Sequence, residues 1–198
     1  MTTEPNSVTL KPSEGSPSFE ISQVDIKGWL IDTLAEMLTQ SFPNAGVKVL
    51  RGWPTDDGAL PCVTVWRLND GEGEQFVGER LEDEMNVDEH GDPDGTGNPT
   101  WGGKMAELWE LRVWSLNPEQ RDKIYFAVKA TILLFKQELV DNDITSIRLS
   151  DGRDEAILDE HGKPMWMTPL HLSLDNPFVI KQLNVPVVTD VDVQETLG

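Results

Sequence analysis

Cysteine is almost absent from this sequence. Cys62 stands alone, so the chain cannot form an internal disulfide. It lies in the apolar run PCVTVW, where a small buried side chain is the expected role. No apolar run reaches the length of a transmembrane helix, and the N-terminal stretch MTTEPNSVTLKPSEGSPSF lacks the basic start and apolar centre of a signal peptide. We therefore expect a protein made in the cytoplasm that does not enter a membrane.

Basic residues are also scarce. The chain has 16 Lys and Arg against 35 Asp and Glu, which gives a formal net charge of -19. Such an excess of carboxylates repels the phosphates of nucleic acids and the anionic face of a membrane. The charge therefore disfavours a protein that grips DNA or binds lipid headgroups.

Motifs with catalytic spacing are lacking as well. The sequence contains no Gly-x-Ser-x-Gly elbow, no His-Glu-x-x-His helix and no paired cysteines. The stretch GNPTWGGKM resembles a phosphate-binding loop, but Asn98 and Met105 stand where that motif needs a glycine and a hydroxyl. We therefore expect neither an enzyme nor a bound cofactor.

The tetrapeptide DEHG occurs twice and places His90 and His161 beside two carboxylates each. One interpretation is a zinc site in which distant loops converge; the other is a pair of tight turns. In the second copy, Gly162 supplies the backbone freedom of a hairpin turn, and apolar strands flank it on both sides. We interpret both copies as turns and expect no metal site.

Apolar spacing predicts two long helices. The first is expected to be capped by Ser22 and to end near Pro43 and Gly46. The second begins where Asn117 caps and Pro118 takes the first helical position, and its expected buried stripe is Ile124, Val128, Thr131, Ile132, Phe135 and Leu139. Strands are predicted at 47–54, 60–68, 106–116 and 144–149, with a hairpin over 155–174.

This order predicts an α+β fold, an antiparallel or mixed sheet flanked by two long helices. Residues 1–20 are expected to form a flexible N-terminal arm, 21–180 a single α+β domain, and 181–198 a C-terminal arm. Residues 82–104 are rich in Asp, Glu and Gly without apolar periodicity, so we expect a long acidic loop inserted in the domain.

Six residues are candidates for an interface. Trp53 and Trp101 lie beside turn or loop signals, where a large ring is useful for binding, although packing over the edge of their own core is the alternative. Val185 and Val187 alternate around Pro186, which cannot donate to a ladder, so we expect an edge strand or an arm paired with a neighbouring chain. His90 and His161, at the expected turns, complete the set.

Three segments carry a resemblance to a known family. They are a helix closing on Phe-Pro and running into a strand, LIDTLAEMLTQSFPNAGVKV, a strand entered through Leu-Pro, LPCVTVWRLNDGEGEQFVGE, and a strand that breaks at Asn-Pro into a helix, ELWELRVWSLNPEQRDKIYFAVKATIL. With the element order, they resemble the tail-terminator, or tail-completion, proteins of tailed bacteriophages.

The resemblance implies a structural virion protein, assembled in the host cytoplasm. It implies a homo-oligomeric ring, a hexamer, that ends the tail tube and joins the tail to the head, with tail tube protein and neck or connector proteins as partners. The genome would pass through an acidic bore without specific binding. The alternatives are another ring protein of the neck or of head completion, and a metal-binding module built on the DEHG segments.

Overall fold

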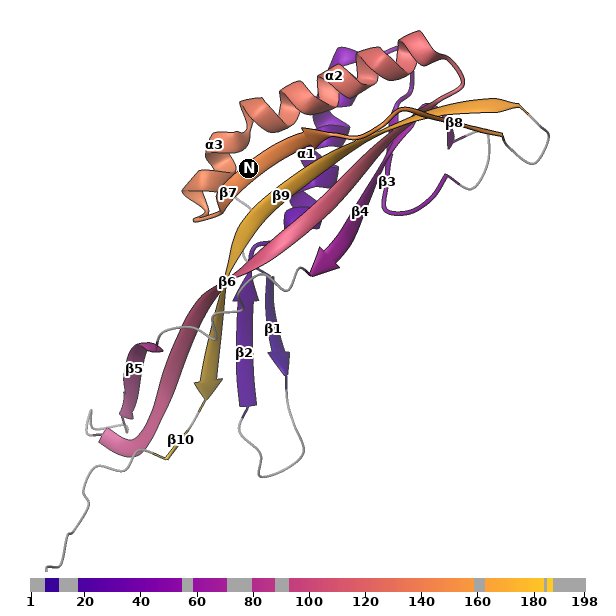
Figure 1. Cartoon of the computed structure of the whole chain (residues 1–198). Coiled ribbons are helices and arrows are strands. Elements are labelled where there is room, and N and C mark those ends of the chain that lie inside the picture. Colours follow the sequence, from indigo (N-terminus) through magenta and orange to yellow (C-terminus); the bar gives the residue numbers. More distant parts are fainter. Residues whose placement is uncertain are drawn as a thin grey trace, which may run out of the picture. The chain divides into compact units, whose positions relative to one another are not determined.

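The computed structural model of the chain describes residues 6–10, 18–54, 59–70, 80–87, 93–158, 163–183 and 185–186. Contacts divide the chain into two compact units (Figure 1). Unit 1 consists of Met1–Glu4, Val24–Glu74 and Met105–Pro177, and unit 2 of Pro5–Gln23, Gln75–Lys104 and Phe178–Gly198. These two units do not coincide with the domain boundaries expected near residues 20 and 180. Those boundaries stay predictions.

Unit 1 contains a mixed sheet. Its strands follow the order β3-β4-β6-β9, and β7 and β8 also pair with β9. Strand β3 is parallel to β4, whereas β4 pairs with β6, and β7 and β8 pair with β9, in antiparallel register. The bounds of the strands are β3 Lys48–Leu50, β4 Cys62–Asp70, β6 Pro93–Ser115, β7 Thr145–Asp151, β8 Glu155–Leu158 and β9 Pro164–Leu183. The hairpin predicted over 155–174 is confirmed by the pairing of β8 with β9.

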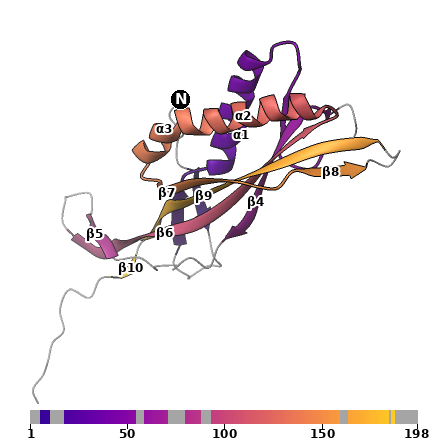
Figure 2. The same ribbon diagram turned by 45° about the horizontal axis from the view of Figure 1, so that its top comes forward.

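The helices of unit 1 are α1 (Ile26–Ser41), α2 (Pro118–Leu134) and the short α3 (Lys136–Asp141). Helices α1 and α2 contact each other and lie on the same side of the sheet (Figures 1 and 2). Their apolar stripes meet alternate residues of the strands, because successive side chains of a strand point to opposite faces. This core includes Leu30, Leu34, Val63, Val65, Leu111, Val113, Ile124, Val128, Leu170 and Leu172.

The predicted sheet flanked by two long helices is therefore wrong. Both long helices bury their stripes in one core on one face, and no helix of the described residues packs on the other face. Among the described residues, that second face has a small buried cluster of Cys62, Trp114 and Met167. Apolar spacing showed that each helix has a buried stripe, but the spacing does not say which side of a sheet the stripe meets.

Unit 2 consists of strands. Its order is β1-β2-β9-β6, and β5 and β10 also pair with β6. The pairs of β1 with β2, β2 with β9, and β5 and β10 with β6 are antiparallel. The strands that belong to this unit alone are β1 Asn6–Leu10, β2 Ser18–Gln23, β5 Arg80–Val87 and β10 Val185–Pro186.

The predicted acidic loop over 82–104 is also wrong, because all of its described residues lie in β5 and β6. The expected N-terminal arm likewise contributes β1 and the start of β2. Backbone hydrogen bonds can hold a strand in a sheet without apolar side chains at alternate positions. A strand rich in Asp and Gly therefore gives no strand signal in the sequence. Among the described helices, none combines the length and apolarity needed to span a membrane.

Candidate functional site

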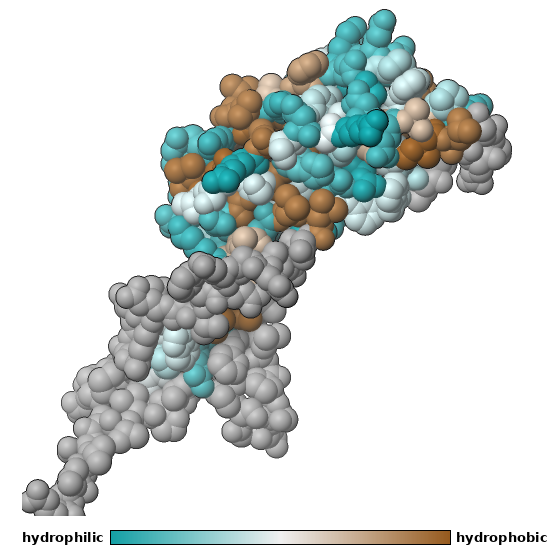
Figure 3. Space-filling view, in the orientation of Figure 1, coloured by the Kyte–Doolittle hydropathy of each residue, from teal (hydrophilic) through white to brown (hydrophobic). Residues whose placement is uncertain are grey.

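The outer surface of α2 in unit 1 exposes large apolar side chains. Phe126, Leu133 and Leu134 are 67%, 56% and 71% exposed, and they recur at helical spacing on the side turned away from the core. Figure 3 shows hydrophobic surface over α2 and α3. Contiguous exposed apolar surface marks interaction sites in soluble proteins. This surface is the first candidate for contact with a partner.

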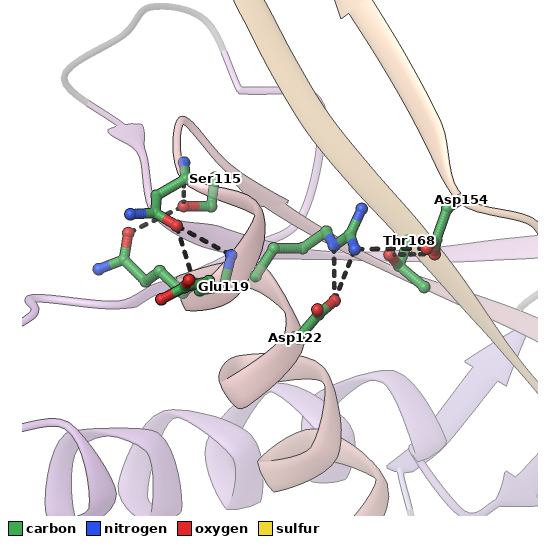
Figure 4. Close-up of polar contacts among 8 residues, drawn as sticks. Ser115, Glu119, Asp122, Asp154 and Thr168 are labelled. Atoms are coloured by element: carbon green, nitrogen blue, oxygen red, sulfur yellow. Dashed lines mark hydrogen bonds and ion pairs between the residues drawn. The ribbon is translucent and has the colours of Figure 1, made fainter.

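Side chains ahead of α2 fix where the helix begins. The Asn117 side-chain oxygen accepts hydrogen bonds from the backbone N–H groups of Glu119 at 2.8 Å and Gln120 at 3.3 Å. The Ser115 hydroxyl accepts from the Asn117 N–H at 3.1 Å and donates to the Gln120 side-chain oxygen at 2.8 Å (Figure 4). Pro118 occupies the first turn, where its missing N–H costs nothing. The predicted start of this helix is confirmed.

A buried arginine follows in the first turns of α2. Arg121 is 5% exposed, and its guanidinium donates to the carboxylates of Asp122 and Asp154 (Figure 4). The Thr168 hydroxyl donates to the other oxygen of Asp154 at 2.7 Å. Charge-assisted hydrogen bonds of this kind hold side chains in fixed positions. They join the start of α2 to the segments that precede β8 and form β9.

A pocket opens beside this group, lined by α2 and the residues around the end of β7. Its walls include Tyr125, Phe126, Lys129, Asp151, Asp154 and Thr168. The Tyr125 hydroxyl and the Lys129 ammonium each donate to the same Asp151 oxygen at 2.6 Å. The pocket therefore combines an exposed aromatic ring with carboxylates whose positions are fixed.

The pKa values in the pocket favour fixed charges over proton transfer. The hydrogen bonds from Lys129 and then Tyr125 hold the pKa of Asp151 below its ordinary value. Desolvation, followed by the hydrogen bond and negative charge of Asp151, raises the pKa of Tyr125 far above its usual range. Near neutral pH the carboxylate is ionised and the phenol is protonated, so neither group is poised for acid–base work. This chemistry suits recognition of a ligand.

A second candidate surface lies on the face of the sheet without a helix. Trp53 is 53% exposed, and its ring lies 5.6 Å from that of Trp66 and 5.5 Å from that of Trp114, centroid to centroid. The Arg112 guanidinium lies 4.7 Å from the centroid of the Trp53 ring, within the range of a cation–π contact. Arg112 also donates to Glu110. The packing on one side holds Trp53 in place while half of it stays in solvent.

Cys62 lies beneath this face, next to Trp114. Burial raises the pKa of its thiol to about 12, against a small opposing effect of Lys48. The thiol is thus protonated at neutral pH and is a poor nucleophile or metal ligand. The predicted role of a small buried side chain is confirmed.

The other predicted interface residues lie in unit 2 or outside the described residues. Trp101 is half-buried in β6 opposite Arg80 of β5. Val185 lies in β10 opposite Gly97, so it pairs within its own chain. His90, His161 and Val187 lie outside the described residues. Their role at an interface stays a prediction, as does that of Trp101 and Val185.

Sequence reasoning missed Phe126 and Arg112. The signal for Phe126 was available, because it is a large apolar residue outside the stripe expected to be buried. Nothing in the spacing predicts that Arg112 lies over Trp53, since the two residues are brought together by tertiary structure. Within the described part of the chain, no group of His, Cys, Asp and Glu is arranged to hold a metal ion. Comparison with known protein families and with curated proteins finds no match to this chain.

Proposed function

We propose that this chain is a structural protein of a tailed virus, a tail terminator that forms a homo-oligomeric ring at the end of the tail tube. The observation that carries the proposal is the exposure of Trp53, Phe126, Leu133 and Leu134, each of which keeps more than half of its surface in solvent. Large apolar side chains held in place at the surface stabilise contacts between proteins. The resemblance in the three sequence segments supplies the kind of assembly.

Local structure in these segments supports the proposal. The helix that closes on Phe-Pro and leads to a strand is α1 followed by β3, and the strand that breaks at Asn-Pro into a helix is β6 followed by α2. The ring would join each copy to the next through two different surfaces, and such an interface closes when its rotation divides the circle. Six copies are the number that the resemblance implies.

The charge of the chain suits the passage of DNA. A ring of chains with a net charge of -19 each would present a strongly negative field. Carboxylates lining a bore would repel phosphates, so the genome could pass without binding. The partners in this proposal are the tail tube protein below and the neck or connector proteins above.

Light scattering on the purified chain, with electron microscopy of the same sample, tests the proposal. We expect a mass near six times 22.1 kDa and ring-shaped particles, either alone or after purified tail tubes are added. A chain that stays monomeric with and without tubes would contradict a terminator. Rings that bind the portal side and ignore tubes would instead assign the chain to the neck.

A further inference from the structure

We infer that Trp53 of one copy inserts into the pocket beside α2 of the next copy, which makes a head-to-tail interface. This inference rests on the proposed self-association and names the surfaces that would carry it. The knob is Trp53 with the arginines beside it. The socket is the pocket whose walls include Tyr125, Phe126, Asp151 and Asp154.

Neighbouring side chains hold the ring of Trp53 in a fixed position before any contact forms. The rings of Trp66 and Trp114 support Trp53 from one side, and Arg112 lies over its ring. A supported aromatic side chain loses little conformational freedom on binding, which is why Trp is enriched among residues that dominate interfaces. The exposed 53% of this residue is therefore available at low entropic cost.

The socket has the chemistry that an indole ring requires. Phe126 offers an exposed aromatic ring, and the side chain of Lys129 offers a cation, both of which attract the face of an indole. The indole N–H needs an acceptor when it is buried, and the side chains of Asp151 and Asp154 are 58% and 59% exposed. Apolar and polar parts of the ring both find partners.

The charges of the two surfaces are complementary. Arg112 lies over the Trp53 ring and donates to Glu110, and the exposed Arg51 precedes Trp53 by two residues in the chain. At the socket, the three carboxylates of Asp122, Asp151 and Asp154 outnumber the two cations that bond to them, Arg121 and Lys129. In a chain with a net charge of -19, two arginines close to an exposed tryptophan are a specific feature that the carboxylates of the socket would attract.

The places of the knob and socket within unit 1 favour a head-to-tail contact. Trp53 follows β3 at one edge of the sheet and packs on the face without a helix. The socket lies on the face that α2 covers, beside β7 and β8 at the other edge. A side chain cannot reach a pocket across the sheet in its own chain. Two different surfaces are what a ring needs from each copy.

An alternative contact would pair α2 with α2 of a second copy through Leu133 and Leu134. The two contacts differ in symmetry, because pairing of α2 with itself joins equal surfaces, whereas the knob and socket join unequal ones. Variants of the two surfaces can therefore be mixed to tell them apart.

The experiment uses Trp53→Ser, which removes the knob, and Phe126→Glu, which blocks the socket. Each variant alone is expected to lose assembly, with the concentration needed for association raised at least about tenfold. An equimolar mixture should form a dimer of twice 22.1 kDa and nothing larger, because Trp53 of the Phe126→Glu chain still fits the socket of the Trp53→Ser chain. Sedimentation velocity measures the masses, and circular dichroism verifies that each variant is folded.

Leu116→Ser is the matched control, since Leu116 is 48% exposed and belongs to neither the knob nor the socket. It should assemble as the parent chain does. Arg51→Glu provides a second variant that changes only an exposed charge, and it should weaken assembly. A mixture of the first two variants that stays monomeric overturns the inference. If Trp53→Ser assembles normally while the parent forms rings, the inference fails and the proposed ring survives; a parent chain that never associates removes both.

Discussion

The two faces of the sheet in unit 1 differ in what covers them. On one face, α1 and α2 bury alternate strand residues, and Leu111 and Leu172 have no exposed surface. On the other face, the buried cluster is limited to Cys62, Trp114 and Met167 and has no helix among the described residues over it. The same strands supply both faces, so the difference arises from the alternation of side chains.

Stability and recognition are therefore divided between the faces. The free energy of folding depends mainly on the area that each face removes from water, and the helix-covered face removes far more of it. The face without a helix, here called the open face, buries less area, so substitutions there cost less free energy of unfolding. It can therefore carry an exposed tryptophan and charged side chains. The predictions below test this division.

Leu111→Ala is expected to have the largest effect. It should lower the free energy of unfolding by about 2–5 kcal/mol, because it removes buried methyl groups and leaves a cavity in the core on the helix-covered face. Met167→Ala, on the open face, should lie at the low end of this range because its cluster is small and relaxes more easily. Urea denaturation measures both. Equal losses would contradict the division between the faces.

Two glutamates on β6 give a smaller contrast. Glu107 lies on the helix-covered face. It accepts hydrogen bonds from the buried Trp109 at 2.7 Å and Asn176 at 3.1 Å, and from the 32% exposed Arg67 at 3.2 Å. Glu110, on the open face, accepts from Arg112 and contacts His171, whose side chains are 22% and 28% exposed.

Glu107→Gln should cost roughly 1–3 kcal/mol of unfolding free energy, since it leaves a buried donor without an acceptor. Glu110→Gln should cost less than about 1 kcal/mol, because water can reach the donors left behind. Thermal denaturation of the two variants at matched pH checks the order. A larger loss for Glu110→Gln would show that the open face is less accessible to water than its exposure indicates.

The smallest effect concerns the phenol of Tyr125, the single tyrosine of the chain. Its pKa lies above the ordinary value of 10.0, because of burial and then the hydrogen bond and charge of Asp151. The folded state holds this proton more tightly than the unfolded state, so the contribution to stability is complete below pH 10.0 and is lost as the pH rises toward the folded pKa.

Asp151→Asn should lower that pKa while leaving it above 10.0, since burial remains. The absorbance of the phenolate measures it without interference from another tyrosine. Lys129→Met serves as a control that removes a neighbouring cation and should not lower the phenol pKa. An unchanged titration in Asp151→Asn would show that Asp151 does not act on the phenol.

Sequence patterns predicted the features that depend on local interactions. The start of α2 follows from Asn117 and Pro118, whose effects reach only one turn. The strand predicted at 106–116 also follows from neighbours along the chain, and its residues Trp109, Leu111 and Val113 lie in the core. In contrast, the expected cap at Ser22 is wrong: Asp25 caps α1 by accepting from the Gly28 N–H at 2.9 Å. Ser22 lies in β2 opposite Val179, a partner that the local pattern does not reveal.

The candidate site could likewise be predicted from the sequence only in its local part. A tryptophan beside a turn was enough to identify Trp53 as a possible contact residue. The socket was missed because Asp151 and Tyr125 meet across a separation of 26 residues along the chain. Only the pairing of β7 with β9, together with the packing of α2 on the sheet, brings these segments together.

Strand β6 runs for 23 residues and supplies both compact units, with its residues before Met105 in unit 2 and the rest in unit 1. Deleting one residue from a strand exchanges its faces beyond that point, so Glu110 would point into the core and Leu111 toward solvent. Removing two residues preserves the faces. Over evolutionary time, length changes in this strand should therefore accumulate in even steps, with odd steps surviving only where a bulge absorbs the extra residue.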